Sequence, residues 1–390
     1  MRLSPWLILA VLFAARASMG FQHQLVASTA PLLQKELGVG WDQIGLLMGA
    51  YFMAGVVIAP PAGAFGARFG ARAVTLVGLA LMVAGALAGA FSTSWPIHLG
   101  ARVIAGAGGV LITVVMTRMV ADWFASGGMA TAMGIFVNAW PVGLSIALLA
   151  APPIAIQAGL SGAFLASAAF CAVGLALIAL VYGDPPRHAD AAPEPAQAWP
   201  SRPAFVLTAL AAMIWGWFNA GFSMVFGFGP AMLIEQGASP LAAGSTVSIA
   251  LWFTILSVPI GGFLSDRFRR PALVILVGAV ASAACIALAG TNYASPALFA
   301  LLGLVVGLPA GPVMALPASV LAPDERAKGM GVFYAIYYLI MVLAPVASGW
   351  LATRMGSSAP AFLTGVAFMA LALASYASFL AMRARRAARG

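Results

Sequence analysis

Long apolar runs, separated by short polar stretches, make up almost the whole chain. Twelve of them are about 20 residues long or longer, the length that an α-helix needs to cross the hydrocarbon core of a bilayer. The expected spans are 5–30, 42–65, 73–92, 97–119, 129–152, 159–182, 203–232, 240–264, 272–290, 296–320, 329–353 and 358–381. A β-barrel would show short segments of alternating polarity instead, so the pattern predicts membrane-spanning helices.

One sizeable polar stretch interrupts this pattern, between the sixth and seventh spans. Residues 183–203 are rich in proline and charge and have no apolar periodicity, which is typical of a linker. We therefore expect an N-terminal unit of residues 1–183, a linker of residues 184–202 and a C-terminal unit of residues 203–390. Each unit would contain six spans.

The two halves also repeat each other in sequence. Residues 30–38 read APLLQKELG and residues 229–237, found 199 positions later, read GPAMLIEQG. The same offset aligns Gly63 with Gly262 and Arg68 with Arg267, and at an offset of 197 MGIF at 133–136 matches MGVF at 330–333. Such a parallel duplication is typical of secondary transporters, whose site lies between the halves. The predicted fold is an all-α membrane protein with twelve transmembrane helices in two pseudo-symmetric six-helix bundles.

Composition agrees with a membrane protein, and the charges predict its orientation. Hydrophobic residues form 63% of the chain, charged residues 7%, and the mean hydropathy is +1.01, whereas a soluble domain is about a quarter charged. The net charge of +9 is concentrated in one set of loops and at the termini, at Arg2, Arg68, Arg72, Arg187, Arg202, Arg267, Arg269, Arg270, Arg326, Lys328, Arg383, Arg385, Arg386 and Arg389. The opposite loops hold Lys35 and Arg354. The positive-inside rule therefore predicts cytoplasmic termini and a cytoplasmic linker in an inner membrane, and the basic excess is not a nucleic-acid footprint.

One charge lies near the middle of the first span. Arg16 is eleven or twelve residues from either end of the run, roughly 17 Å of helix. A guanidinium can reach only part of that distance, so Arg16 is expected to face protein or a water-filled space. No Asp or Glu lies in the middle of any span. A planar guanidinium without a mid-span acid favours an anionic solute such as a carboxylate; a tether to backbone carbonyls is the structural alternative.

Two loops and the fourth span carry motifs of a known family. Residues 63–72 read GAFGARFGAR and resemble the G-x-x-x-D-R-x-G-R-R loop of the major facilitator superfamily; a degenerate second copy, GFLSDRFRR, covers 262–270. Residues 102–109, RVIAGAGG, match the R-x-x-x-G-x-G motif of the fourth span. The resemblance covers nearly the whole chain and implies alternating access. Arg16 and Asn138 make the chain most similar to bacterial cyanate/nitrate-type and organic-anion carriers.

Several further residues are candidates for the solute site. His23 lies seven residues after Arg16, on nearly the same helix face, and either carries a proton or hydrogen-bonds a neighbouring helix. Trp215 and Asn219 share a face in the seventh span, as a pocket wall or as packing. Tyr334 and Tyr337 carry hydroxyls that need partners if buried. The predicted substrate-binding set is Arg16, His23, Asn138, Trp215, Asn219, Tyr334 and Tyr337.

A second set of residues is expected to control the conformation. In the family, the loop aspartate faces the start of the eleventh span; here that position is Ala67, whereas the second copy keeps Asp266. Internal symmetry predicts that Asp266 faces residues 126–128 at the start of the fifth span, the alternative being an arginine of its own loop. Asp324 and Glu325 are expected to pair with Arg68 or Arg72. The gating set is Gly63, Arg68, Gly70, Arg72, Arg102, Asp266, Arg267, Asp324 and Glu325, with packing as the alternative for Arg102.

These patterns predict a transporter of a small anionic solute. The sequence contains no phosphate loop, metal cluster or catalytic triad, so neither an enzyme nor a cofactor is expected. The expected partners are the lipid bilayer, the anion and a proton or counter-anion, and the protein is expected to be a monomer. A proton-coupled exporter of apolar compounds and a non-transporting receptor are the alternatives. Cys171 and Cys285 lie inside apolar runs without metal or redox spacing and are assigned to packing.

Overall fold

The computed structural model describes residues 4–125, 127–183, 198–291 and 293–387, without the side chains of residues 63, 64, 67 and 130. Arg2, Ser126, Arg187, Arg389 and most of the 184–202 linker lie outside the described residues. Within them the fold is helical, with α1 (Pro5–Ser28), α2 (Ala30–Leu37), α3 (Trp41–Phe69), α4 (Ala71–Ala90), α5 (Trp95–Trp123), α6 (Met129–Val137), α7 (Ala139–Leu180), α8 (Arg202–Glu235), α9 (Pro240–Phe268), α10 (Pro271–Ala289), α11 (Pro296–Val306), α12 (Ala310–Met314), a 3₁₀ turn (Pro317–Ser319), α13 (Arg326–Met355) and α14 (Pro360–Ala387).

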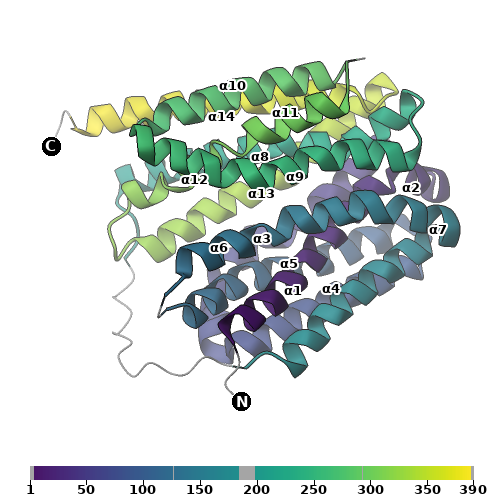
Figure 1. Ribbon diagram of the computed structural model, residues 1–390, viewed down its shortest axis with the longest axis horizontal. Helices are drawn as coiled ribbons and strands as arrows, with labels where there is room; N and C mark the ends of the chain where they lie inside the picture. Colours follow the sequence, from purple (N-terminus) through teal and green to yellow (C-terminus); the bar gives the residue numbers. More distant parts are fainter. Residues whose placement is uncertain (1–3, 126, 184–197, 292, 388–390) are drawn as a thin grey trace.

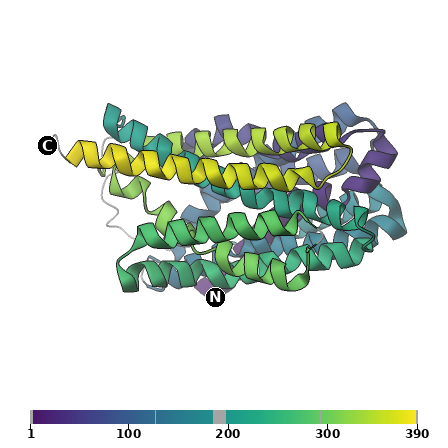
Figure 2. The ribbon, with the colours of Figure 1, turned by 90° about the horizontal axis from the view of Figure 1, so that it is seen from above.

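The helices form two groups that follow the order of the chain (Figure 1). Helices α1 to α7 lie together in the lower part of that view and α8 to α14 in the upper part, and the view from above shows the long helices running roughly parallel (Figure 2). In Figure 1 the C-terminus lies at the left and the N-terminus at the bottom, near the middle, and we name the side on which α14 ends the terminal end. The opposite side, which holds α2 and the start of α3, is the far end.

Eleven described segments are long and apolar enough to cross a membrane. One of them, Thr131–Leu180, contains 50 residues, and a straight helix of that length would be about 75 Å long, more than twice the hydrocarbon thickness. The backbone breaks within it at Gly159, where φ is 71° and ψ is 179°, a conformation that glycine adopts without steric cost. The segment is therefore a helical hairpin of two spans. The predicted twelve-span, all-α fold is confirmed.

Prolines break two of the expected spans. The tenth span, expected as one run over 296–320, consists of α11, α12 and the 3₁₀ turn, because Pro309, Pro312 and Pro317 each lack the N–H that a continuous helix needs. The fifth span is interrupted at Asn138, where α6 ends and α7 begins. Pro141 cannot donate to the carbonyl of residue 137, which accounts for the interruption.

The two groups of helices pack closely at the far end, along α3 and α13 and along α7 and α9. A Cβ atom added at Gly45 would collide with the carbonyl oxygen of Pro345, and one added at Gly349 would collide with that of Trp41. The Asp42 backbone N–H also donates to Thr353 Oγ1 at 2.9 Å, and this hydroxyl donates to Asp42 Oδ1 at 3.0 Å. Towards the terminal end, a Cβ at Gly331 would be 3.4 Å from its nearest neighbour, Pro60 Cβ. The halves are therefore closed tightly at the far end and packed less closely at the terminal end.

Candidate functional site

Arg16 and Arg102 have opposite environments, and Arg102 on α5 is the one with hydrogen-bond partners. Its Nε donates to the Leu47 carbonyl at 3.1 Å, Nη1 to the Gln22 carbonyl at 2.7 Å and Nη2 to the His23 carbonyl at 3.0 Å. The guanidinium carbon also lies 4.6 Å from the centre of the Tyr51 ring, and the residue is 3% exposed. Arg102 thus ties α5 to α1 and α3, as expected of the packing alternative.

Replacing Arg102 with alanine should destabilise the protein strongly. The change removes the guanidinium together with its three hydrogen bonds and leaves a cavity. We expect the free energy of unfolding to fall by about 3 kcal/mol. Thermal unfolding in detergent measures it, with Arg386→Ala, an exposed arginine at the end of α14, as the control. Equal melting temperatures for the two variants would contradict this structural role.

Arg16 on α1 is the arginine without partners. It is half-buried, its buried Nε has no hydrogen-bond partner, and it forms no hydrogen bond or ion pair with any described residue. Its guanidinium carbon lies 4.5 Å from the centre of the Phe136 ring of α6. A guanidinium has five N–H groups that can each donate a hydrogen bond, and an aromatic ring face offers no acceptor atom for a conventional hydrogen bond. Arg16 is therefore available to bind an acceptor that the protein does not itself supply.

The groups opposite Arg16 come from the other half of the molecule. The ionisable groups that interact with it electrostatically are the phenols of Tyr338, Tyr334 and Tyr337, all on α13. The three rings form a cluster with centroid separations of 5.1 to 6.4 Å. Arg16, Phe136 and these tyrosines, which we name the Arg16 cluster, thus span the boundary between the two groups of helices.

His23 lies in a closed aromatic environment. Its ring centroid is 5.2 Å from that of Tyr51, 4.8 Å from that of Phe52 and 5.2 Å from that of Trp140. The residue is 5% exposed, and its Nδ1 atom has no hydrogen-bond partner among the described residues. The Arg102 guanidinium is bonded to the backbone carbonyl of His23. Protonation would thus place a second cation beside Arg102 in a site closed to water, which is unfavourable.

The other predicted site residues are distributed around the Arg16 cluster with different contacts. Asn219 Nδ2 donates to the Trp215 carbonyl at 2.8 Å, so this amide is bonded within its own helix, α8. The Trp215 side chain is half-buried and packs against the C-terminal core. Asn138 occupies the break between α6 and α7, two residues from Phe136, and is half-buried.

Most of the gating set lies exposed at the terminal end. Gly63 is part of α3 and Gly70 links α3 to α4 with a φ of 86°. Arg72 donates from Nη2 to the Ala179 carbonyl at 2.6 Å, and the Arg68 guanidinium lies 5.3 Å from the Phe69 ring. Asp266 and Arg267 form no hydrogen bond or ion pair with any described residue. The expected contact of Asp266 with residues 127 and 128 is therefore not formed in this conformation.

The acidic pair at the start of α13 is bonded differently from the expected pairing with Arg68 or Arg72. Glu325 Oε1 accepts from the Ser201 N–H at 2.8 Å and Oε2 from the Ala322 N–H at 3.1 Å, while the Asp324 carbonyl accepts from the Ala198 N–H at 3.0 Å. The Ser201 hydrogen bond, followed by that of Ala322, lowers the pKa of Glu325. In this conformation Glu325 therefore holds the chain just before α8.

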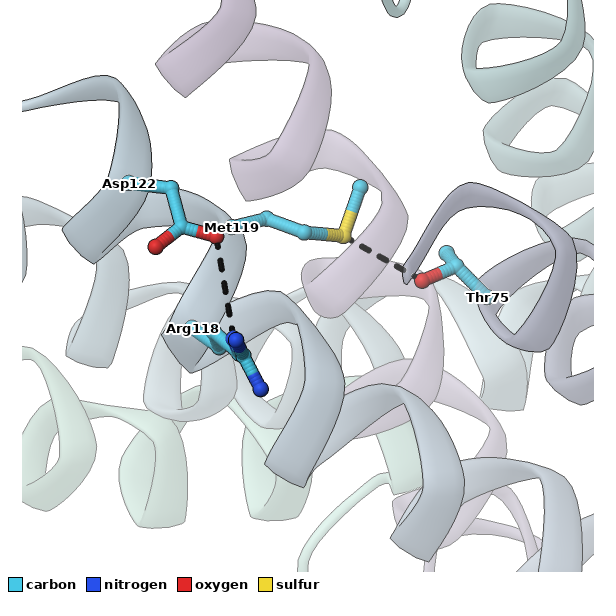
Figure 3. Close-up of polar contacts among 4 residues, drawn as sticks. All are labelled: Thr75, Arg118, Met119 and Asp122. Carbon is cyan, nitrogen blue, oxygen red and sulfur yellow. Dashed lines mark hydrogen bonds and ion pairs between the residues drawn. The ribbon is translucent and has the colours of Figure 1, made fainter. Parts of the chain in front are cut away.

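One intrahelical ion pair accounts for the charges at the terminal end of α5 (Figure 3). Arg118 Nε and Asp122 Oδ2 are 3.8 Å apart at positions i and i+4, and both side chains are about half exposed. The neighbouring Met119 sulfur accepts from Thr75 Oγ1 at 3.3 Å. Thr113 and Thr117 donate to carbonyls of their own helix. These residues stabilise α5 and its contact with α4.

Sequence reasoning missed the aromatic residues that surround the two key side chains. Phe136, Phe52, Tyr51 and Trp140 contact Arg16, His23 or Arg102. In an apolar span an aromatic residue gives no signal of its own. Phe136 was recognisable only as a member of the MGIF repeat.

Comparison with known proteins agrees with this fold of two helical groups. The model of the Major Facilitator Superfamily (MFS) matches residues 12–236 and 218–389, so the chain belongs to that superfamily. A curated relative, "Uncharacterized MFS-type transporter Rv1250" of Mycobacterium tuberculosis, is 26% identical over 149 residues, 38% of this chain. The match spans 25% of that relative's length.

Solved transporters share the fold. A bacterial homologue of the human lysosomal transporter Spinster, inward-facing and unoccupied, has a TM-score of 0.76 at 16% identity, covering 98% of both chains. The nucleoside transporter NupG has a TM-score of 0.73 at 15% identity, covering 96% of this chain and 99% of that one. As a member of the superfamily, the chain is a multi-pass membrane protein, and membrane transport is the function that the family indicates. The narrower resemblance to cyanate, nitrate and organic-anion carriers stays a prediction.

Proposed function

We propose that this transporter carries a small solute with a carboxylate or similar oxyanion, by alternating access of two six-helix units (1–183 and 203–390) in an inner membrane. The observation that carries the proposal is the unpartnered guanidinium of Arg16, which faces the other half of the molecule at mid-span. A half-buried cation within a membrane span and without a counter-charge is costly. A carboxylate that forms two parallel hydrogen bonds with it offsets that cost.

Ligand-induced thermal stabilisation tests the charge requirement. Formate, acetate and benzoate are compared with their neutral amides, formamide, acetamide and benzamide. A ligand that binds the native state raises the melting temperature in a concentration-dependent way. We expect at least one anion to stabilise the protein and its amide to have no effect. Stabilisation by an amide equal to that by its anion would contradict an anion site at Arg16.

The proposed orientation places the terminal end in the cytoplasm. Exposed basic residues gather there, among them Arg267, Arg269 and Arg270, whereas Lys35 and Arg354 lie at the far end. The structure, closed at the far end, would then face inward. In this proposal Asp266, Asp324 and Glu325 exchange partners with the opposite half when the terminal end closes.

Cysteine labelling tests this orientation. A cysteine replacing the exposed Arg269 should react with a membrane-impermeant maleimide in inside-out vesicles and not in intact cells, whereas one replacing Arg354 should do the reverse. The native cysteines, Cys171 and Cys285, are buried and give little background. Labelling of the Arg269 position from outside intact cells would contradict the proposed topology.

The enclosed ring of His23 indicates uniport or anion exchange rather than proton coupling through this residue. The change His23→Gln keeps a polar side chain of similar size and removes the titratable ring. We expect uptake into proteoliposomes to respond to an imposed pH gradient to the same extent before and after the change. Loss of a gradient response that the unmodified protein shows would identify His23 as the proton carrier.

A further inference from the structure

The ionisable groups that interact with Arg16 all lie on α13. Asn219 is bonded to its own helix, and His23 is enclosed by three aromatic rings. The remaining donors are the phenols of α13. A small inorganic anion is strongly hydrated on all sides, and a site that replaces this shell on one side only leaves it poorly solvated. The environment of Arg16 therefore suits a solute with a single polar end.

An apolar groove runs along α1 from the terminal end to the vicinity of Arg16. Its volume is about 360 Å³, within the range of small-molecule pockets, and its walls are Trp6, Leu9, Ala10, Phe13 and Ile135. No polar side chain lines it. Four of these walls are partly open: Trp6 is 52% exposed, Ile135 is 40% exposed, Ala10 is exposed, and Phe13 is half-buried.

The groove and the Arg16 cluster are continuous along two helices. Phe13 precedes Arg16 by one helical turn on α1, and Leu9 precedes it by seven residues, which places Leu9 within about 20° of the same face. On α6, Ile135 of the groove is followed directly by Phe136, over whose ring Arg16 lies. From Arg16 to Leu9 the distance along the helix is about 10 Å. A solute whose charged end lies at Arg16 can therefore place an apolar body of that length in the groove.

The charges limit the solute to one negative group. Arg16 has no ion-pair partner among the described residues, and no carboxylate interacts with it electrostatically. The second cation of the spans, Arg102, already donates to three carbonyls. A dicarboxylate would leave one charge without a partner in the apolar groove.

From this geometry we infer that the substrate is an aromatic or aryl-alkyl monocarboxylate. Its carboxylate is bound by Arg16, and its apolar body lies in the groove between α1 and α6, against Phe13 and Ile135. This inference rests on the anion site proposed above and adds to it the body that the anion carries. Flat aromatic rings pack favourably against such walls.

Binding of a series of probes tests the inference with the intact protein. Formate, benzoate, 3-phenylpropanoate and benzamide are titrated by thermal stabilisation or calorimetry. We expect benzoate and 3-phenylpropanoate to bind at least tenfold more tightly than formate, and benzamide not to bind. Formate binding as tightly as benzoate would overturn the aromatic body while leaving the anion proposal standing. Benzamide binding as tightly as benzoate would overturn the anion proposal itself.

A pair of phenylalanine variants locates the body. Phe13→Ala removes one wall of the groove, whereas Phe91→Ala removes a ring that is 78% exposed at the end of α4. Phe13→Ala should weaken benzoate binding at least fivefold, with formate binding and the melting temperature of the free protein nearly unchanged. Phe91→Ala should change none of these. Equal benzoate affinity in the Phe13 variant and the unmodified protein would show that the groove does not hold the substrate.

Discussion

Replacing Arg16 with alanine is expected to abolish anion binding and transport while leaving the protein folded. The guanidinium contributes no hydrogen bond to any described residue, so its removal costs the fold little. Loss of a charged, bidentate partner weakens carboxylate binding by about 3 kcal/mol or more, over a hundredfold in Kd. Arg16→Lys keeps the charge but not the planar fork, and we expect a weakening of roughly tenfold.

Binding titrations and proteoliposome uptake measure both variants. Arg354→Ala is the matched control, because that arginine is exposed at the far end and its guanidinium lies 4.9 Å from the Trp350 ring. The control should bind and transport normally. Full binding by the alanine variant of Arg16 would remove this residue from the site. A large fall in its melting temperature would instead show that Arg16 is a structural tether.

A valine at Gly45 is expected to open the far end and slow transport more than tenfold. The added side chain would collide with the carbonyl of Pro345, where α3 and α13 belong to opposite halves. Because the collision exists only when the far end is closed, the change raises the free energy of that conformation alone. An increase of about 3 kcal/mol reverses a near-balanced two-state equilibrium. The protein would then spend most of its time in the opposite conformation.

A reporter cysteine at Ala352 measures this shift. Ala352 lies on α13 near the far end and is fully buried in this structure. Its reaction rate with an impermeant maleimide should rise several-fold in the Gly45→Val background. Gly100→Val is the control, because a Cβ there has open space around it. Equal labelling rates in the two backgrounds would mean that α3 and α13 do not close the far end.

The architecture could be predicted from sequence because membrane solvation imposes it. A backbone in hydrocarbon must satisfy its hydrogen bonds internally, so the apolar runs had to be helices. The breaks were less predictable. The prolines of the tenth span indicated bending points, but not that Val306 would end α11. The hairpin turn at Gly159, by contrast, lies where the sequence already shows two separate runs.

The site could be predicted only in part, because sequence gives the position of a charge but not its partners. Arg16 and Arg102 both read as arginines within spans, and only the fold shows that one is bonded to three carbonyls and the other to none. The amide of Asn219 likewise looked available and is bonded to its own helix. The apolar groove depends on the approach of α1 to α6, which no local pattern encodes.

The hydrogen bonds of Arg102 have a mechanical consequence. They fasten α1 to α3 and α5, so in the proposed alternating-access cycle Arg16 would move with these helices as one body, whereas the tyrosines opposite it would move with α13. A solute that contacts both Arg16 and these tyrosines would connect the two halves reversibly. The affinity of the protein for the solute would therefore differ between conformations. By thermodynamic reciprocity, bound solute would shift the populations of those conformations. The solute would thus act as an effector of the protein's conformation, and a higher binding affinity would slow its release.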